Sequence, residues 1–272
     1  MRRAAITLAL GLAAVTLAAA LKAGPAEEAV LMLWSRQAEM EPAEAAVLCA
    51  RALDSGTLGS YAPVARTLMG LNLLKAGRPQ DAAAAYASAL SSGGDPLSRA
   101  ADNQARRWLT RIDREALVAA LRQWYAANVA YPPALDVLQT LPDIQTLPLQ
   151  DRWGDPWNYR LVPMRQMPQL TDQRYQLESR ALFRSSDLAT ALRQLESSTT
   201  HVRFLRIVSR QPPVISVEIT QPEMDPVNAT LALGASASGV RLCALSPIMA
   251  ICSDGDRWIM VPFRSDPAGE RP

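Results

Sequence analysis

Apolar and polar positions divide the chain into four stretches with different periodicities. The first is an uncharged run of 18 apolar or small residues, Ala4 to Leu21, directly behind Arg2 and Arg3. A positive flank before an apolar run is a membrane-targeting signal, and the positive-inside rule places the rest of the chain on the far side of the membrane. A helix of this length spans about 27 Å, which suits either a retained single-pass inner-membrane anchor or a cleaved signal peptide over residues 1–25. Either way, we expect the bulk of the protein in the periplasm.

Residues 26–112 have a composition that favours helices, because Ala, Leu, Glu, Gln and Arg dominate it. Turn residues interrupt the stretch at Pro42, at Gly56–Gly59, at Gly77–Pro79 and at Gly93–Pro96. This punctuation predicts helical hairpins, closed by a last helix over residues 96–112.

Small residues and a tyrosine recur in this helical stretch at steps of seven, five, four and three: Gly70, Gly77, Ala82, Tyr86 and Ala89. The spacing resembles the roughly 34-residue tetratricopeptide repeat, with a degenerate half-repeat before it. The resemblance implies that Gly70 lets two helices approach closely, that Gly77 ends the first helix, and that Tyr86 fills the space between them. Since about three repeats are usually needed for a stable solenoid, we expect a packing module.

Residues 113–197 change from helical to strand periodicity. Apolar side chains at i, i+4, i+7 and i+8 predict a helix over 113–128, with this face: Leu117, Leu121, Trp124 and Tyr125. A Tyr-Pro-Pro run ends that helix, and a short second helix is expected over 134–141. After the Gly154–Pro156 turn, residues 157–161 and 174–179 alternate and are expected to pair as antiparallel strands.

This order of helix, Tyr-Pro, short helix and Asp-x-Trp-Gly-x-Pro-aromatic-x-Tyr resembles the globular domain of the major pseudopilin of type II secretion systems. The matching residues are Tyr131, Pro132, Leu138, Leu147, Pro148, Asp151, Trp153, Gly154, Pro156, Trp157 and Tyr159. The resemblance covers about residues 113–192. It implies an α+β domain whose turn locks a hairpin onto a long helix, followed by a loop that often binds calcium.

Two departures limit what the resemblance implies here. The loop after the second strand, Arg180–Leu188, offers Asp187 as its one carboxylate, whereas calcium takes six to eight oxygen ligands. We therefore predict that the calcium site is lost, and we expect no cofactor. The prepilin-type signal is also missing, so we expect that the chain does not polymerise as a pilin.

Residues 198–266 contain short β-branched or alternating runs separated by turn residues, which predicts a sandwich or barrel of five or six strands. The expected strands are residues 201–208, 214–220, 229–233, 240–245, 249–253 and 258–263. Residues 267–272 are predicted to form a disordered tail. The whole chain is thus expected to be an α+β multidomain protein with an N-terminal membrane helix.

The β region is weakly similar to the small periplasmic domain of type II secretion clamp proteins and of type IV pilus pilot proteins. The positions that carry this similarity are Leu231, Leu233, Gly234, Gly239, Val240, Leu242, Trp258 and Met260. If Leu245 pairs with Ala250, then Cys243 faces Cys252 at about 4.5–5.5 Å between Cβ atoms. Either a disulfide, which an oxidising compartment allows, or two buried thiols would satisfy this pairing.

Composition and charge exclude several functions. The formal net charge is +2, and no Lys/Arg-rich block occurs, so we expect no nucleic-acid partner. With one histidine, His201, and three cysteines, the chain has little material for a zinc site or a His-dependent triad. It shows no nucleophile-elbow or phosphate-loop pattern. We therefore expect no enzymatic activity.

These observations favour a membrane-anchored periplasmic accessory or scaffold protein of a type II secretion or type IV pilus-like machine. Its expected partners are other proteins of that machine and the membrane, and a homo-oligomer is compatible with the hypothesis. A second hypothesis is an extracytoplasmic enzyme or binding protein that uses Trp124, Trp153 or Trp157 in a pocket. A third is a general periplasmic adaptor of the tetratricopeptide type.

Overall fold

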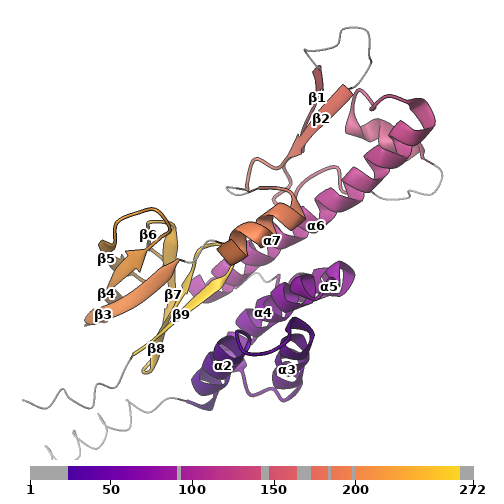
Figure 1. The fold of residues 1–272 in the computed structure, drawn as a ribbon. Coiled ribbons are helices and arrows are strands. Elements are labelled where there is room, and N and C mark those ends of the chain that lie inside the picture. Colours follow the sequence, from indigo (N-terminus) through magenta and orange to yellow (C-terminus); the bar gives the residue numbers. More distant parts are fainter. Residues whose placement is uncertain are drawn as a thin grey trace, which may run out of the picture.

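The computed structural model describes residues 24–90, 93–141, 147–163, 173–182, 185–197 and 200–263. The fold is α+β, with helices in the first half of the chain and small antiparallel sheets in the second (Figure 1). The membrane segment predicted from residues 4–21 and the tail at 267–272 lie outside the described residues. Within the described residues, no helix has both the length and the apolar character needed to span a bilayer.

Four helices and a short 3₁₀ turn form the N-terminal part. They are α2 (Pro25–Arg36), α3 (Pro42–Asp54), η1 (Gly59–Tyr61), α4 (Ala62–Lys75) and α5 (Pro79–Ala89). Each α-helix has a proline at its first or second position, where the missing N–H costs no hydrogen bond. The turn residues in the sequence therefore mark the helix boundaries well.

The long helix α6 (Pro96–Asn128, 33 residues) corrects one expectation. The helices predicted over 96–112 and 113–128 are a single helix, because no Gly or Pro separates them and the apolar face continues. Asp95 caps its start by accepting hydrogen bonds from the backbone N–H groups of Leu97 and Ser98. The domain boundary placed between residues 112 and 113 therefore lies inside a continuous helix.

The region after α6 folds back along this helix, and its last element packs against the first half of α6, near Ala105 and Trp108. It consists of η2 (Leu135–Thr140), the hairpin β1 (Asn158–Pro163) and β2 (Gln173–Glu178), and α7 (Leu188–Ser197). The hairpin is antiparallel, with Tyr159 opposite Leu177. The short helix expected over 134–141 is a 3₁₀ helix.

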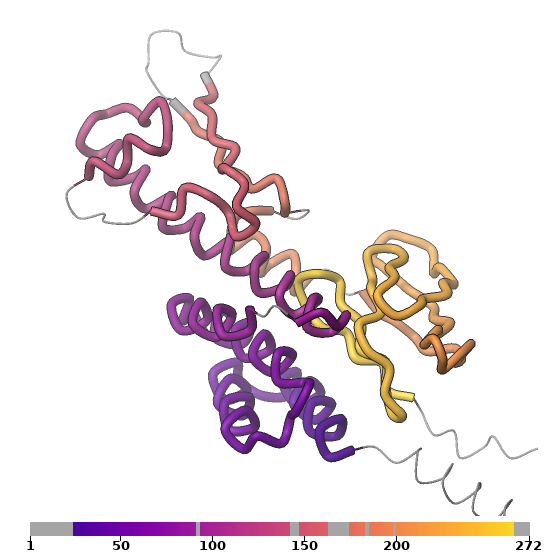
Figure 2. The backbone as a smooth tube through the Cα atoms, turned by 180° about the vertical axis from the view of Figure 1, so that it is seen from behind, coloured from indigo at the N-terminus to yellow at the C-terminus, as the bar shows by residue number. Residues whose placement is uncertain are grey.

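Two antiparallel sheets make up the C-terminal part (Figure 2). The first has the order β3-β4-β5: β3 (His201–Arg210), β4 (Pro213–Thr220) and β5 (Val227–Ala232). The second has the order β6-β7-β8-β9: β6 (Ser236–Ala237), β7 (Val240–Leu245), β8 (Met249–Ser253) and β9 (Trp258–Pro262). Apolar side chains of both sheets meet in one buried cluster, so the sheets pack face to face.

The four-stranded sheet is buried on both faces along β8 and β9. Its second face contributes Cys243, Ile251, Trp258 and Met260 to a cluster shared with α2, α3, α4 and α6. The indole N–H of Trp258 donates to the Oγ1 of Thr67 in α4 at 2.7 Å. The order of layers is therefore helices, four-stranded sheet and three-stranded sheet, and the helical and β regions share one core.

Candidate functional site

The loop between η2 and β1 holds the residues that the sequence singles out, and Asp151 organises it. Its buried carboxylate accepts hydrogen bonds from the backbone N–H groups of Trp153 and Asp155, at 3.0 and 3.1 Å. Its other oxygen accepts the hydroxyl proton of Ser179, which follows β2, at 2.7 Å. Gly154 has φ +91°, a backbone conformation that glycine adopts without strain. Asp151 thus closes the turn and ties it to the far end of the hairpin.

Arg152, the residue after Asp151, fixes the same loop to α6. The Arg152 guanidinium makes a two-fold contact with the carboxylate of Asp113, one bond being 2.8 Å long. Its backbone N–H donates to Thr110, and its backbone oxygen accepts from Arg106. All three partners lie on α6, so the hairpin cannot shift along the helix while these bonds persist.

Aromatic side chains fill the space between the hairpin and α6. Trp157 is buried in the core there, and its indole N–H donates to the backbone oxygen of Pro148 at 2.7 Å. The Tyr159 hydroxyl donates to the backbone oxygen of Pro132 at 2.7 Å. The ring of Tyr131 lies 4.7 Å from that of Tyr175 on β2. Burial raises the pKa of Tyr159 to about 12, so this phenol stays protonated further into the alkaline range than an exposed tyrosine does.

Two remaining motif residues are more exposed. Trp153 is half-buried at the loop, and Pro156 is exposed while pairing across the turn with Gln150. On α6, Trp124 packs against the same core, and the ring of Tyr125 lies 4.7 Å from that of Tyr131. The structure therefore brings the motif residues together in one region, as a packed hairpin dock.

The five residues with repeat-like spacing meet at the α4–α5 contact. A Cβ atom on Gly70 would lie 2.8 Å from the ring of Tyr86, so only glycine admits that ring against α4. Gly77 ends α4 with φ +71°, and the next N–H bonds back to Leu73. Ala82 and Ala89 are buried on α5 beside Tyr86. This geometry is what a helical hairpin requires, and assignment to a repeat family stays a prediction.

The cysteine pair corrects a second expectation. Leu245 does face Ala250, but a β-bulge at Cys243 shifts the register, so that Leu242 faces Cys252. Cys243 then belongs to the core shared with the helices, whereas Cys252 belongs to the core between the sheets. All three cysteines are buried free thiols, and burial raises the pKa of Cys243 and Cys252 to about 12.

A buried ion cluster that the sequence did not indicate lies between α6 and the turn from β8 to β9. The Asp256 carboxylate, 1% exposed, accepts from Arg107 Nε at 2.8 Å and Nη2 at 3.1 Å, and from Arg111 Nη1 at 2.8 Å. Its backbone oxygen accepts from Gln104 and Trp108. Burial acts to raise the pKa of Asp256, but the two guanidinium groups outweigh it and lower this pKa to about 2. The cluster joins segments about 150 residues apart.

The sequence carries only a weak signal for this cluster. Arg107 and Arg111 are four residues apart and share the buried face of α6 with Trp108, where charges are unusual. The Asp254-Gly255-Asp256 run by itself indicates only a turn. Nothing local in either segment indicates that they meet.

The loop after β2 bears on the calcium prediction. Arg114 of α6 donates to the backbone oxygen of Leu177 and contacts the carboxylate of Asp187 at 3.3 Å. No group of three or more potential metal-ligating side chains occurs in the described parts of the chain. Residues 183–184 of this loop lie outside the described residues, so loss of the calcium site stays a prediction.

Comparisons of the chain with protein-family models, with curated proteins and with solved structures find no match. The resemblances to the pseudopilin domain, to the tetratricopeptide repeat and to the secretion clamp domain therefore rest on the residues named above.

Proposed function

We propose that this protein is a non-enzymatic, membrane-anchored periplasmic scaffold component of a type II secretion or type IV pilus-like machine. The observation that carries the proposal is the Asp151 loop, which pins the β1–β2 hairpin to α6 through Ser179 and through the Arg152–Asp113 pair. This is the arrangement that resemblance to the pseudopilin domain implies. In a scaffold, such a module provides a rigid contact unit.

The overall shape supports a spacer role. At about 1.5 Å per residue, α6 is about 50 Å long. The helices α2–α5 and the two larger sheets lie beside its first half, and the β1–β2 hairpin lies at the other end (Figure 1). The first and last described elements, α2 and β9, lie away from the hairpin. An anchor formed by residues 4–21 would then hold the hairpin far from the membrane surface.

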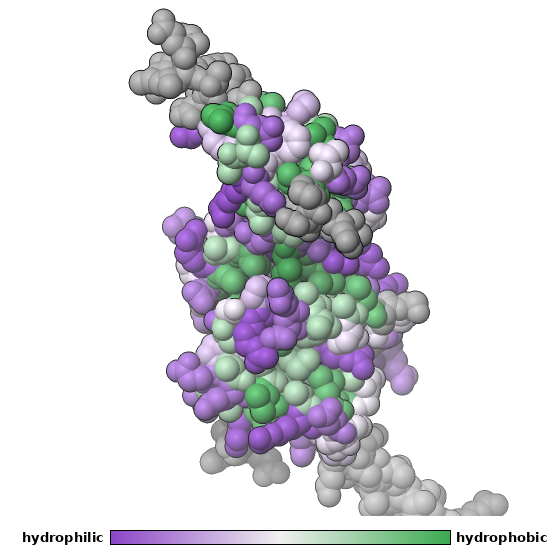
Figure 3. All heavy atoms as spheres, turned by 90° about the vertical axis from the view of Figure 1, so that its right-hand side faces the viewer, coloured by the Kyte–Doolittle hydropathy of each residue, from purple (hydrophilic) through white to green (hydrophobic). Residues whose placement is uncertain are grey.

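Surface character also supports protein contacts. On the side of the molecule shown in Figure 3, hydrophobic side chains reach the surface between hydrophilic clusters. A groove of about 440 Å³ crosses α3, α4 and α5, lined chiefly by apolar side chains such as those of Val47, Met69 and Leu73. By contrast, the Trp157 indole is buried in the core, which disfavours Trp157 as part of a ligand site.

The test is capture of partners from membranes. The full-length chain, tagged at its C-terminus and produced in its native host, is cross-linked and purified from detergent-solubilised membranes, and co-purifying proteins are identified by mass spectrometry. The proposal predicts recovery of a secretin, a pseudopilin or an inner-membrane platform protein. Recovery of none of these from the wild-type chain would overturn it.

A matched pair of variants links capture to the hairpin dock. Asp151→Asn weakens the hydrogen bonds of the loop. Asp155→Asn alters an exposed side chain, and Asp155 takes part in the turn only through its backbone. We expect capture to fall for Asp151→Asn and to persist for Asp155→Asn at equal membrane levels. Equal capture by both variants would contradict a role of the dock in partner binding.

A further inference from the structure

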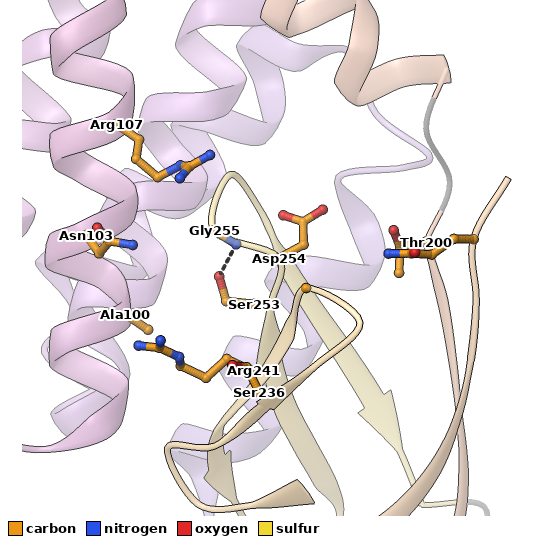
Figure 4. A pocket seen from close by; sticks show the side chains of 11 residues that line it. Ala100, Asn103, Arg107, Thr200, Ser236, Arg241, Ser253, Asp254 and Gly255 are labelled. Atoms are coloured by element: carbon orange, nitrogen blue, oxygen red, sulfur yellow. Dashed lines mark hydrogen bonds between the residues drawn. The ribbon is translucent and has the colours of Figure 1, made fainter. Parts of the chain in front are cut away.

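A cleft of about 480 Å³ lies where α6, the β6–β7 hairpin and the β8–β9 turn meet (Figure 4). From α6 it is lined by Ala100, Asn103 and Arg107, which are spaced as one stripe of the helix. From the sheets it is lined by Arg241 and Ser253, with Ser236 and Thr200 at its sides. The cleft is thus built by parts of the chain that are far apart in sequence.

Its lining departs from the pattern of the surrounding core. Arg241 follows Val240, which points into the core between the sheets, so Arg241 lies on the opposite face, toward the helices. Elsewhere on that face the side chains are apolar, among them Cys243 and Ile251. Here an arginine and a serine face a helix stripe that offers an alanine, an amide and a second arginine. Apolar packing gives way to a polar space.

The charge around this space is positive. Two arginines, Arg107 and Arg241, and one carboxylate, that of Asp254, line the cleft. Behind this lining, Arg111 pairs with Asp256 and Arg257 pairs with Asp254. Both carboxylates are already engaged. Asp256 lies between two guanidinium groups, and Asp254 accepts the N–H groups of Asp256 and Arg257.

Of the two arginines that line the cleft, Arg241 is the one that we expect to contact a ligand. No ion pair joins Arg241 to another residue in the described ranges, although its side chain reaches into the cleft toward α6 (Figure 4). The Asn103 amide on α6 and the Ser236 hydroxyl add hydrogen-bond donors on the same side of the cleft, whereas Thr200 lies beyond Asp254 (Figure 4).

We propose that this cleft binds an oxyanion, a carboxylate or a phosphate, with Arg241 as the principal contact and the Asn103 amide as a further donor. A guanidinium in a concave, donor-rich site matches the planar geometry of such groups. The oxyanion is either an acidic side chain of a partner protein or a small free anion. The inference stands apart from the proposed function, since it concerns a different end of α6 from the hairpin dock.

Calorimetric titration of the purified full-length chain in detergent tests the site. One arm uses an acidic peptide, acetyl-Gly-Asp-Gly-Glu-Gly-amide, and its isostere with Asn and Gln. The other arm uses inorganic phosphate, with chloride as the reference at equal ionic strength. Binding of the acidic peptide but not of its isostere assigns the oxyanion to a protein side chain, and binding of phosphate alone assigns it to a free anion. Absence of binding in both arms overturns the proposal.

Variants locate the binding. Arg241→Gln should weaken it about ten-fold or more, because loss of a charge-assisted hydrogen bond costs at least one factor of ten. Arg241→Lys should restore part of it, since the charge returns without the planar fork. Arg206→Gln, an exposed arginine on β3, should leave the affinity unchanged. Equal affinity of the wild type and Arg241→Gln would overturn the assignment to this cleft.

Discussion

Two buried aspartates, each in a tight turn with a glycine of positive φ, stabilise this molecule in different ways. Asp151 receives two backbone N–H groups and one hydroxyl, all uncharged donors, and closes a local turn onto the neighbouring hairpin. Asp256 receives two guanidinium groups from a helix about 150 residues away. The hydrogen bonds of Asp151 could form within its own turn and hairpin. The ion pairs of Asp256 can form only after α6 and the β sheets have packed together.

The difference between the two aspartates indicates which contacts contribute to the stability of the whole fold and which contribute to one region. A carboxylate satisfied by neutral donors loses a few hydrogen bonds when it is removed. Removal of a carboxylate that lies between two buried arginines leaves the arginine charges uncompensated, which lowers the free energy of unfolding far more. We therefore expect the Asp256 cluster to control global stability and the Asp151 loop to control the hairpin dock.

The largest expected effect is that of Asp256→Asn. With Arg107 and Arg111 left buried without a carboxylate, the free energy of unfolding should fall by about 3–5 kcal/mol. Urea unfolding monitored by tryptophan fluorescence measures it. Asp225→Asn, at an exposed loop position, is the control and should change stability by no more than about 0.5 kcal/mol. A loss for Asp256→Asn no larger than that for Asp151→Asn would break the comparison.

The pH dependence of the free energy of unfolding should reveal the contribution of the same cluster. The folded pKa of Asp256, about 2, lies below its ordinary value of 3.8, so the folded state binds this proton less tightly than the unfolded state does. The resulting stability, about 2 kcal/mol, is present above about pH 4 and is lost as the pH falls through 2. Unfolding free energies measured from pH 6 to pH 2 should decline more steeply for the wild type than for Asp256→Asn. Parallel curves would show that Asp256 does not titrate as described.

A smaller loss is expected for Asp151→Asn. One oxygen acceptor is replaced by an amide donor beside the Ser179 hydroxyl and the backbone N–H groups, so unfolding should become easier by about 1–3 kcal/mol. Hydrogen exchange should show the loss concentrated in β1 and β2, with the β3–β9 amides protected as before. Uniform loss of protection across both regions would show that the hairpin is not a separable dock.

The smallest effect is expected for Arg152→Gln. Its guanidinium is partly exposed where it contacts Asp113, and exposed ion pairs contribute about 0–1 kcal/mol. The same denaturant series measures this, and 1 M salt should remove most of the difference from the wild type. A loss comparable to that of Asp151→Asn would assign the attachment of the loop to Arg152.

Much of the local structure follows from short patterns. Residues 240–245 and 249–253 are β-branched or alternating runs that turn residues flank, and they form β7 and β8 with the same bounds. The Gly154–Pro156 turn and the Gly77 helix end require backbone conformations that few residues adopt, so they are visible in the sequence. The α4–α5 contact depends on Gly70 because a Cβ atom there would collide with Tyr86.

Other features have no local signal. The bulge at Cys243 comes from how β7 fits β8 and the helices, and it moves the cysteines onto different faces of the sheet. The oxyanion cleft exists only because helix and sheet meet.

The sequence by itself determined where most helices and strands lie, although not that residues 96–128 form one helix, and it determined which turn could pin a hairpin, because these depend on neighbouring residues and on backbone freedom. The tertiary structure alone decided that Asp256 lies between Arg107 and Arg111, and that Arg241 faces a cleft. Charge pairing between distant segments leaves no periodic trace, since Coulomb attraction acts on final positions in space and not on order along the chain.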